Sequence, residues 1–276
     1  MSAALAACPA AAAGQARWER PARCAQPRRC LVRAAAKNVS TKGSTTTKGG
    51  SASTKGGDGA PGFKFDGSMQ RWVRDDRFAG KSMTTVQPLS GTAYTVWPVM
   101  HTYLTEKGLK QVDEEEALAL ARKGAVIVDV RLADDYKKEH IEGAVSVPMF
   151  RLTQGTSNWD NVKRFVMGSL AMKATERDPD FLANFGKAMG GNKRKTIIVA
   201  CAVGGTLDTV ASWGVRVATT GKSAQDPDRA FGRETRSLKA CYELMQAGYT
   251  NVIHLKGGLS SWRYNGYPTE GSNVRD

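Results

Sequence analysis

Long apolar runs are missing from this sequence. No stretch approaches the roughly 18 uninterrupted apolar residues that a membrane-spanning helix needs. The best short run, residues 125–130, already contains Asp129. We therefore expect a soluble or at most peripheral protein with no transmembrane segment.

Cysteine and histidine are scarce as well. The 276 residues include only five cysteines and three histidines, and no Cys/His cluster has the spacing of zinc ligands. Three cysteines lie within the first 36 residues, which leaves Cys201 and Cys241 for a folded domain. One pair is no disulfide framework, and we expect neither a metal site nor a cofactor. Cys241 lies in an apolar helical pattern, which predicts a small buried hydrophobic residue.

Acidic residues are nearly absent from the first 57 positions. This segment holds six Arg and four Lys against Glu19 alone, so it carries +9 of the formal charge of +14. The remaining 219 residues carry only +5. A basic surface strong enough to hold a phosphate backbone is poorly supported by that balance, and no nucleic-acid partner is expected.

Residues 1–36 are rich in Ala and Arg and end in small residues. This pattern predicts an organelle transit peptide with a processing site, and the alternative is a basic arm without a targeting role. The composition resembles that of algal plastid transit peptides. It favours a chloroplast protein, located in the stroma or peripherally at the thylakoid.

Side chains able to pack are rare between residues 37 and 62, a Ser/Thr/Lys/Gly tract that predicts a flexible linker. Residues 63–110 regain aromatic side chains without a clear period. They predict an N-terminal extension that packs on the domain that follows. We expect that domain to span residues 111–270.

From residue 113 onward, helical and strand patterns alternate. Asp113 and Glu116 form the pattern of a capping box at a helix start. We expect helices at 113–122, 132–139, 180–189 and 234–247, and strands at 125–130, 144–147, 196–200 and 251–255. Because the strands are apolar on both faces, they predict a parallel sheet covered by helices on both sides. Between the two halves, Trp159, Phe165, Phe181 and Phe185 are expected to pack.

Cys201 directly follows the predicted strand 196–200 and precedes Gly204 and Gly205. Parallel sheets bind ligands at the carboxyl ends of their strands, which is where this cysteine falls. Glycines allow the backbone to curl so that successive N–H groups face an anionic sulfur, and a following helix start adds a positive field. The alternative is an inert cysteine that ends a core strand, and the residues alone leave both interpretations open.

Two groups of residues resemble the signatures of rhodanese-like domains, most closely those of plant and algal plastid members. The first group is Val126-Ile127-Val128-Asp129-Val130-Arg131, Tyr136, His140-Ile141-Glu142-Gly143-Ala144 and Val147-Pro148. The second is Arg236-Ser237-Leu238-Lys239-Ala240, Ala247-Gly248-Tyr249-Thr250-Asn251-Val252, Leu255-Lys256-Gly257-Gly258-Leu259 and Trp262. The resemblance implies an α/β fold with a five-stranded parallel sheet and helices on both faces.

The resemblance also implies sulfane-sulfur transfer, in which a loop cysteine takes sulfur from a small donor such as thiosulfate, holds it as a persulfide and passes it to a thiol or protein acceptor. Cys201 matches the nucleophile. The backbone amides of the next five residues match the persulfide cradle: Ala202, Val203, Gly204, Gly205 and Thr206. The other signature residues are expected to be structural: Asp129, Arg131, His140, Gly143, Gly257 and Gly258. His101 and His254 are expected to have no functional constellation around them.

One departure from the family pattern concerns the loop after the cysteine. In many active members an Arg follows the Cys within a few residues, but here Arg236 follows Cys201 by 35 positions. Residues 207–232 therefore form an insertion, for which we expect a role in access or in binding a protein partner. Arg236 remains a candidate substrate-binding residue.

Three functions compete at this stage. The leading hypothesis is a plastid sulfurtransferase of the thiosulfate type, and the retained Cys201 favours it. The second is a catalytically silent rhodanese-like binding or scaffold module, which the insertion favours. Phosphatase chemistry is the third, but it needs an Arg six residues after the Cys, where this chain has Leu207.

Overall fold

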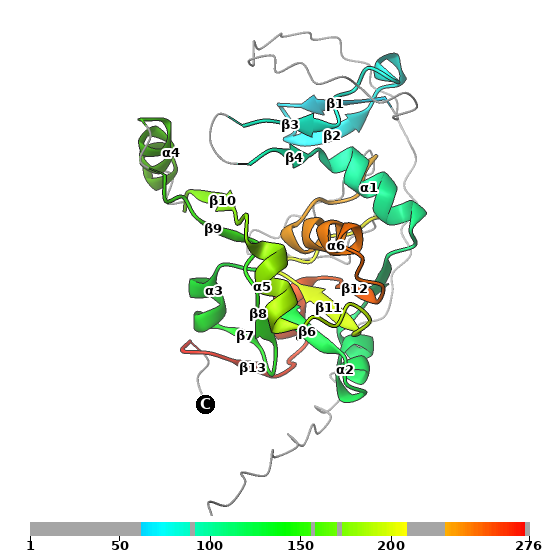
Figure 1. The fold of residues 1–276 in the computed structure, drawn as a ribbon, viewed down its shortest axis with the longest axis vertical. Helices are drawn as coiled ribbons and strands as arrows, with labels where there is room; N and C mark the ends of the chain where they lie inside the picture. The colour runs from blue at the N-terminus through cyan, green and yellow to red at the C-terminus, as the bar shows by residue number, and fades with distance from the viewer. Residues whose placement is uncertain (1–61, 89–91, 156–157, 170–172, 209–229, 274–276) are drawn as a thin grey trace, which may run out of the picture. The chain divides into compact units, whose positions relative to one another are not determined.

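The computed structural model describes residues 62–88, 92–155, 158–169, 173–208 and 230–273 (Figure 1). The chain divides into two units, 1–46 and 47–276, and every described residue belongs to the second. The predicted transit peptide, nearly all of the predicted linker and most of the predicted insertion lie outside the described residues. Within the described part, no helix is long and apolar enough to cross a membrane.

A five-stranded sheet lies at the centre, with the strand order β5-β12-β11-β6-β8 and every neighbouring pair parallel. The strands are β5 (Lys110–Val112), β6 (Val126–Asp129), β8 (Val145–Ser146), β11 (Ile197–Ala200) and β12 (Val252–Leu255). All residues of β11 and β12 are buried, because layers of the chain cover both faces of a central parallel strand. The predicted five-stranded parallel α/β fold is confirmed.

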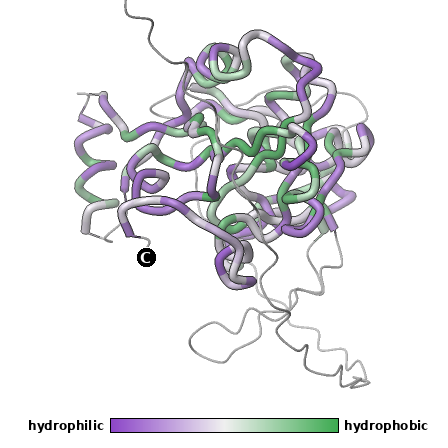
Figure 2. The backbone as a smooth tube through the Cα atoms, turned by 90° about the horizontal axis from the view of Figure 1, so that it is seen from below, coloured by the Kyte–Doolittle hydropathy of each residue, from purple (hydrophilic) through white to green (hydrophobic). Residues whose placement is uncertain are grey.

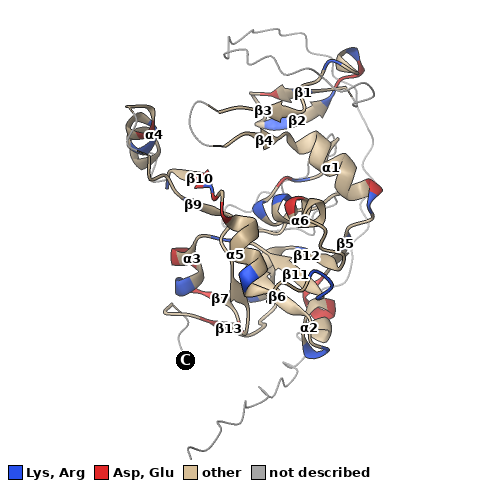
Figure 3. Ribbon diagram, viewed as in Figure 1, with Lys and Arg blue, Asp and Glu red and all other residues tan. Residues whose placement is uncertain are grey.

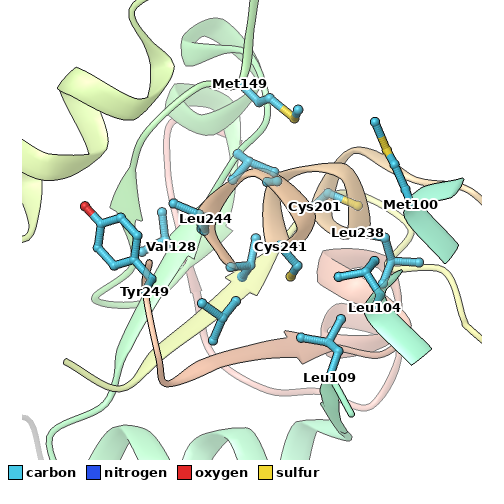
Figure 4. Packing of buried hydrophobic residues seen from close by; sticks show 14 of the residues in the cluster. Met100, Leu104, Leu109, Val128, Met149, Cys201, Leu238, Cys241, Leu244 and Tyr249 are labelled. Atoms are coloured by element: carbon cyan, nitrogen blue, oxygen red, sulfur yellow. The ribbon is translucent and has the colours of Figure 1, made fainter. Parts of the chain in front are cut away.

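Side chains alternate between the two faces of β11. Ile197 and Val199 belong to one large apolar cluster, whereas Ile198 points to the opposite face and is equally buried. Cys241 is fully buried in the same cluster, which confirms the prediction of a small buried hydrophobic residue. Figure 4 shows Cys201 and Cys241 within this cluster, and in Figure 2 the hydrophobic segments lie together in the interior.

Apart from one helix described below, the helices in the described part of residues 113–265 are α2 (Glu114–Arg122), α3 (Ala133–Lys138), α5 (Phe181–Ala188), α6 (Arg236–Gln246) and α7 (Gly258–Tyr264). The first four, and four of the sheet strands, lie within two residues of their predicted bounds. At the start of α2, the Asp113 carboxylate accepts a hydrogen bond from the Glu116 amide at 2.9 Å, as the capping-box pattern predicts. α7 was not predicted, because it holds only seven residues.

The N-terminal segment contains β1 (Phe63–Asp66), β2 (Arg71–Arg74), the 3-10 helix η1 (Asp76–Phe78), β3 (Thr85–Val86), β4 (Tyr94–Thr95) and α1 (Trp97–Glu106). The Trp97 indole N–H donates to the Phe231 carbonyl at 2.7 Å. His101 Nε2 lies 2.8 Å from the Leu207 carbonyl, and Phe63 packs edge-on against the Phe231 ring. The segment thus contacts both ends of the predicted insertion.

Two short antiparallel pairs and one further helix complete the described elements: β7 (His140–Ile141) with β13 (Thr269–Glu270), β9 (Phe150–Leu152) with β10 (Thr175–Arg177), and α4 (Asn158–Ser169). Phe181 and Phe185 are fully buried, as expected. The expectation for Trp159 and Phe165 is wrong, since both lie on α4, which buries only Asp160. Figure 3 shows Lys and Arg interspersed with Asp and Glu over the described helices and strands.

Candidate functional site

Cys201 lies immediately after β11, at the carboxyl edge of the sheet, and its residue is only 4% exposed. The loop that begins here is fixed to the start of α7. The Cys201 carbonyl accepts a hydrogen bond from the Leu259 amide at 2.9 Å, and the Ala202 carbonyl accepts one from the Ser260 amide at 2.9 Å. The Ser260 hydroxyl also donates to the Ala202 carbonyl, at 2.6 Å. The two backbone bonds hold the sulfur-bearing residue in one position.

Two glycine turns pack backbone against backbone beside the cysteine. Gly204 has φ +77° and Gly258 has φ +58°, both in the left-handed region that glycine adopts without strain. A Cβ atom on Gly204 would lie 2.4 Å from the Gly257 nitrogen, and one on Gly258 would lie 2.2 Å from the Cys201 carbonyl oxygen. The contact therefore requires residues without side chains, and this is the position of the predicted signature glycines Gly257 and Gly258.

The sulfur faces two hydrogen-bond donors. The Gly204 amide lies 3.3 Å from Cys201 Sγ, and the Ser237 hydroxyl oxygen lies 3.2 Å from it. The amides of Gly205 and Thr206, two further members of the predicted cradle, donate instead to backbone carbonyls of the loop and of the chain beyond it.

The remaining predicted cradle residues, Ala202 and Val203, form the turn between Cys201 and Gly204. Val203 accepts through its carbonyl from the Gly205 amide at 3.1 Å.

Ser237 and His254 are the residues that the sequence analysis missed. The expectation that His254 has no constellation around it is wrong: its Nε2 lies 3.0 Å from the Ser237 hydroxyl and 3.1 Å from the Gly204 carbonyl. His254 comes from β12 and pairs in register with Val199 of β11, so the two side chains share a face of the sheet. α6 covers this face and presents Ser237 from its first turn.

The electrostatics of this cluster follow from burial. His254 is fully buried, and the loss of hydration lowers the pKa of its imidazole to about 4. The Gly204 carbonyl opposes this shift, and the positive Lys256 nearby adds to it. His254 is therefore neutral at physiological pH. Burial raises the pKa of the neighbouring Cys241 thiol, which keeps that sulfur protonated.

Arg236, the candidate substrate-binding residue, lies beside this cluster. It lines a cavity of about 390 Å³ together with Thr235, Lys239, Trp72 and other residues of the N-terminal segment and of the chain after the insertion. Its guanidinium stacks over the Phe150 ring, 5.2 Å from the ring centroid. Thr235 connects the cavity to the cysteine loop, because its hydroxyl donates to the Gly204 carbonyl.

The Asp129 and Arg131 side chains form a buried ion pair at the end of β6. The Arg131 guanidinium donates to Asp129 at 2.6 to 3.0 Å and to the Glu139 carbonyl at 2.6 Å. The pair ties the strand end to the residue that follows α3.

His140 stacks on the Tyr136 ring with 3.8 Å between centroids, and its Nδ1 lies 2.9 Å from the Tyr136 carbonyl. Gly143 follows in the turn to β8 with φ +69°. His140 thus lies at the start of β7 and Gly143 in the turn that follows it, and His140 contacts protein groups, with Glu270 at 3.4 Å from its Nε2.

The fold and the site define an α/β protein with a thiol loop at the carboxyl edge of a parallel sheet. Residues 113–265, more than half of the chain, match the family model described as the rhodanese-like domain. The chain belongs to the rhodanese-like domain family.

Two proteins of Arabidopsis thaliana illustrate this relationship. The chain is 33% identical over 189 residues to rhodanese-like domain-containing protein 14, chloroplastic, an alignment that covers 68% of this chain and 76% of that protein. It is 27% identical over 143 residues to thiosulfate sulfurtransferase 16, chloroplastic, with 52% and 78% covered. The solution structure of a rhodanese-like domain from Anabaena is 21% identical and covers 59% of this chain and 80% of that one. The TM-score of this match is 0.31.

Proposed function

We propose that this protein is a sulfurtransferase that carries sulfane sulfur as a persulfide on Cys201. The observation that supports the proposal is the placement of Cys201 Sγ at the sheet edge within 3.3 Å of two donors, the Gly204 amide and the Ser237 hydroxyl. Such donors stabilise negative charge on sulfur, and the thiolate is the nucleophilic form of cysteine.

The proposed reaction has two displacements at sulfur. In the first, the Cys201 thiolate attacks the outer sulfur of thiosulfate, the S–S bond of the donor breaks with its electron pair, and sulfite leaves. In the second, an acceptor thiolate attacks the terminal sulfur of the persulfide and releases the Cys201 thiolate. No external oxidant or reductant is needed, because the sulfur carries its own oxidation state through both steps.

Arg236 is the residue that we assign to donor binding. It lines the cavity, its guanidinium lies over the Phe150 ring, and it forms no ion pair within the described residues. Lys239, Arg71 and Arg233 add further cations to the cavity wall, and Glu234, which pairs with Lys239, adds one carboxylate. A dianionic donor such as thiosulfate is attracted to such a wall before its sulfur reaches the thiol.

The name of one relative, thiosulfate sulfurtransferase 16, favours this reaction class, and both reported Arabidopsis relatives are named chloroplastic. We accordingly propose a plastid location for this protein, with residues 1–36 as the transit peptide. Sequencing the N-terminus of the native protein tests this assignment. An N-terminus at Met1 would refute it.

A second candidate function is a binding module without turnover. The low exposure of Cys201, at 4%, favours it, because a donor must reach the sulfur. The partner of such a module would be a protein.

Substitution at the two buried cysteines separates these functions. Cys201→Ser keeps the size of the side chain but cannot form a persulfide, so thiosulfate:cyanide sulfur transfer should vanish and the mass of one added sulfur at this residue should be lost. Cys241→Ser is the matched control: it should lower stability by on the order of 1 kcal/mol but spare activity per folded molecule. Equal transfer rates in wild type and Cys201→Ser would exclude the enzyme and leave the binding module.

A further inference from the structure

Three N–H or O–H donors converge on the Gly204 carbonyl oxygen: the Thr235 hydroxyl, the Ser237 hydroxyl at 3.0 Å and His254 Nε2 at 3.1 Å. The Cys201 thiol lies farther from this oxygen, at 3.9 Å, and a thiolate has no proton to donate to it. A carbonyl oxygen has two lone pairs, so it accepts two of these donors fully. The Thr235 hydroxyl and the His254 N–H can occupy both lone pairs of this oxygen. The Ser237 proton can therefore be directed elsewhere, and Cys201 Sγ lies 3.2 Å from the Ser237 oxygen.

The second imidazole nitrogen of His254 fixes the position of the ring proton. Nδ1 is buried and has no hydrogen-bond partner among the described residues. A proton on Nδ1 would be a buried donor without an acceptor, which is costly. A proton on Nε2 instead points at the Gly204 carbonyl and the Ser237 oxygen. The neutral ring is therefore the Nε2–H tautomer, and it acts as a donor toward both oxygens.

We propose that His254 and Ser237 form a buried donor relay to Cys201: the imidazole N–H donates to the Ser237 oxygen, whose own proton then turns toward the sulfur. Ser237 stabilises negative charge on Cys201 Sγ, and His254 is a positioning residue that acts through Ser237. For the persulfide the proposal rests on the proposed function, since Ser237 would also bind its inner sulfur. For the thiolate it stands without that function.

The relay works without placing a charge beside the sulfur. The strands beside β11 carry Asp129 on β6 and His254 on β12, with Lys256 directly after β12. The helices around the loop carry Arg236, Lys239, Cys241, Tyr242 and Glu243 on α6, Arg263 and Tyr264 on α7, and Glu114 on α2 beside the Gly257 turn. Asp129 pairs with Arg131, Lys239 with Glu234, Glu243 with Arg177 and Arg263 with Glu139. His254 and Cys241 are neutral, because burial lowers the pKa of the imidazole and raises that of the thiol. The groups that stabilise negative charge at the closest distance to the sulfur are therefore two neutral donors, the Gly204 amide and the Ser237 hydroxyl.

The test is the rate at which iodoacetamide alkylates Cys201 over a pH series, without any sulfur donor. Mass spectrometry of the Cys201 peptide separates this cysteine from the other four. In Ser237→Ala, alkylation near neutral pH should be about tenfold slower than in wild type, because one hydrogen bond to a charged sulfur is lost. The two rates should converge at high pH, where both thiols are ionised. Unfolding would expose the thiol and speed alkylation, so slower alkylation cannot arise from misfolding.

Three further variants isolate the relay. His254→Leu should slow alkylation several-fold. In the double variant Ser237→Ala/His254→Leu the second substitution should add little to the effect of Ser237→Ala, because the proposal assigns the effect of His254 on the sulfur to its contact with the Ser237 oxygen. Ser237→Thr keeps the hydroxyl and should retain most of the wild-type rate. Ser260→Ala is the matched control, since its hydroxyl binds the same loop at the Ala202 carbonyl but does not contact the sulfur.

Two results would overturn the proposal. If Ser237→Ala follows the wild-type alkylation profile at every pH, Ser237 does not stabilise the thiolate. If the effects of Ser237→Ala and His254→Leu add fully, His254 does not act through Ser237. Because no donor is present, a failure of sulfur transfer leaves this experiment unaffected, and a failure here leaves the Cys201→Ser test of the proposed function unaffected.

Discussion

The buried His254 should make the protein sensitive to mild acid. In the unfolded chain the imidazole has its ordinary pKa of 6.5, whereas in the folded protein burial lowers that pKa to about 4. Between these two values the unfolded state binds a proton that the folded state excludes. Stability is therefore fully present above pH 6.5 and falls as the pH drops toward about 4.

The size of the effect follows from the same two values. Each pH unit inside the window costs about 1.4 kcal/mol of unfolding free energy, so about 2 kcal/mol is lost by pH 5 and about 3 kcal/mol across the whole window. His254→Leu removes the titrating group and keeps an apolar side chain of similar volume. The unfolding free energy of the variant should therefore not show this decrease between pH 6.5 and 4. A change in stability that is the same at every pH does not affect the comparison.

Urea denaturation of wild type and His254→Leu, at several pH values between 7 and 4, measures how the unfolding free energy of each protein depends on pH. Burial also lowers the pKa of His101, but that contribution is common to both proteins and cancels in the comparison. Parallel curves for the two proteins would refute the reasoning, because they would mean that His254 is accessible to protons in the folded state.

Two further substitutions test the contacts that hold the loop. Trp97→Phe removes the donor to the Phe231 carbonyl and should lower the unfolding free energy by about 1–3 kcal/mol in urea denaturation, and an unchanged stability would contradict the contact. Gly258→Ala places a Cβ atom against the Cys201 carbonyl and should cost several times the roughly 1 kcal/mol expected for Gly266→Ala, which has a similar φ of +73° but open space around it. Equal melting temperatures of the two glycine variants would argue against the close approach.

The central strands could be predicted from the sequence because their signals are local. An apolar β-branched run such as 196–200 identifies a buried strand without knowledge of its neighbours, and Asp113 with Glu116 identifies a helix start. β5 gave no such signal, since three residues cannot show a period, and it begins at Lys110 within the predicted N-terminal extension.

The aromatic residues of α4 show the limit of pattern reading. Trp159 and Phe165 predicted packing by their type alone, yet the side chains are 47% and 79% exposed. The hydrophobicity of a side chain determines the free energy gained if it is buried, but it does not determine whether another helix or strand packs against it.

The Ser237–His254 pair could not be predicted, for a different reason. Its geometry depends on the register of β12 beside β11 and on the helix α6, which places Ser237, 36 positions after Cys201, beside the sulfur. A serine and a histidine 17 positions apart carry no motif. Only the arrangement of the sheet brings them next to the sulfur. The position of Cys201 at the sheet edge, by contrast, could be predicted from the single strand that precedes it.

The site keeps its geometry despite the long insertion because the two sides of the insertion are joined at its base. Thr206 and Arg233 exchange backbone hydrogen bonds in an antiparallel bridge. The N-terminal segment binds just beyond this bridge, where Trp97 holds the Phe231 carbonyl and His101 holds the Leu207 carbonyl. These bonds bring the start of α6, and with it Ser237, back to the cysteine loop. The N-terminal segment is therefore part of the support of the thiol site, although the family match begins only at residue 113.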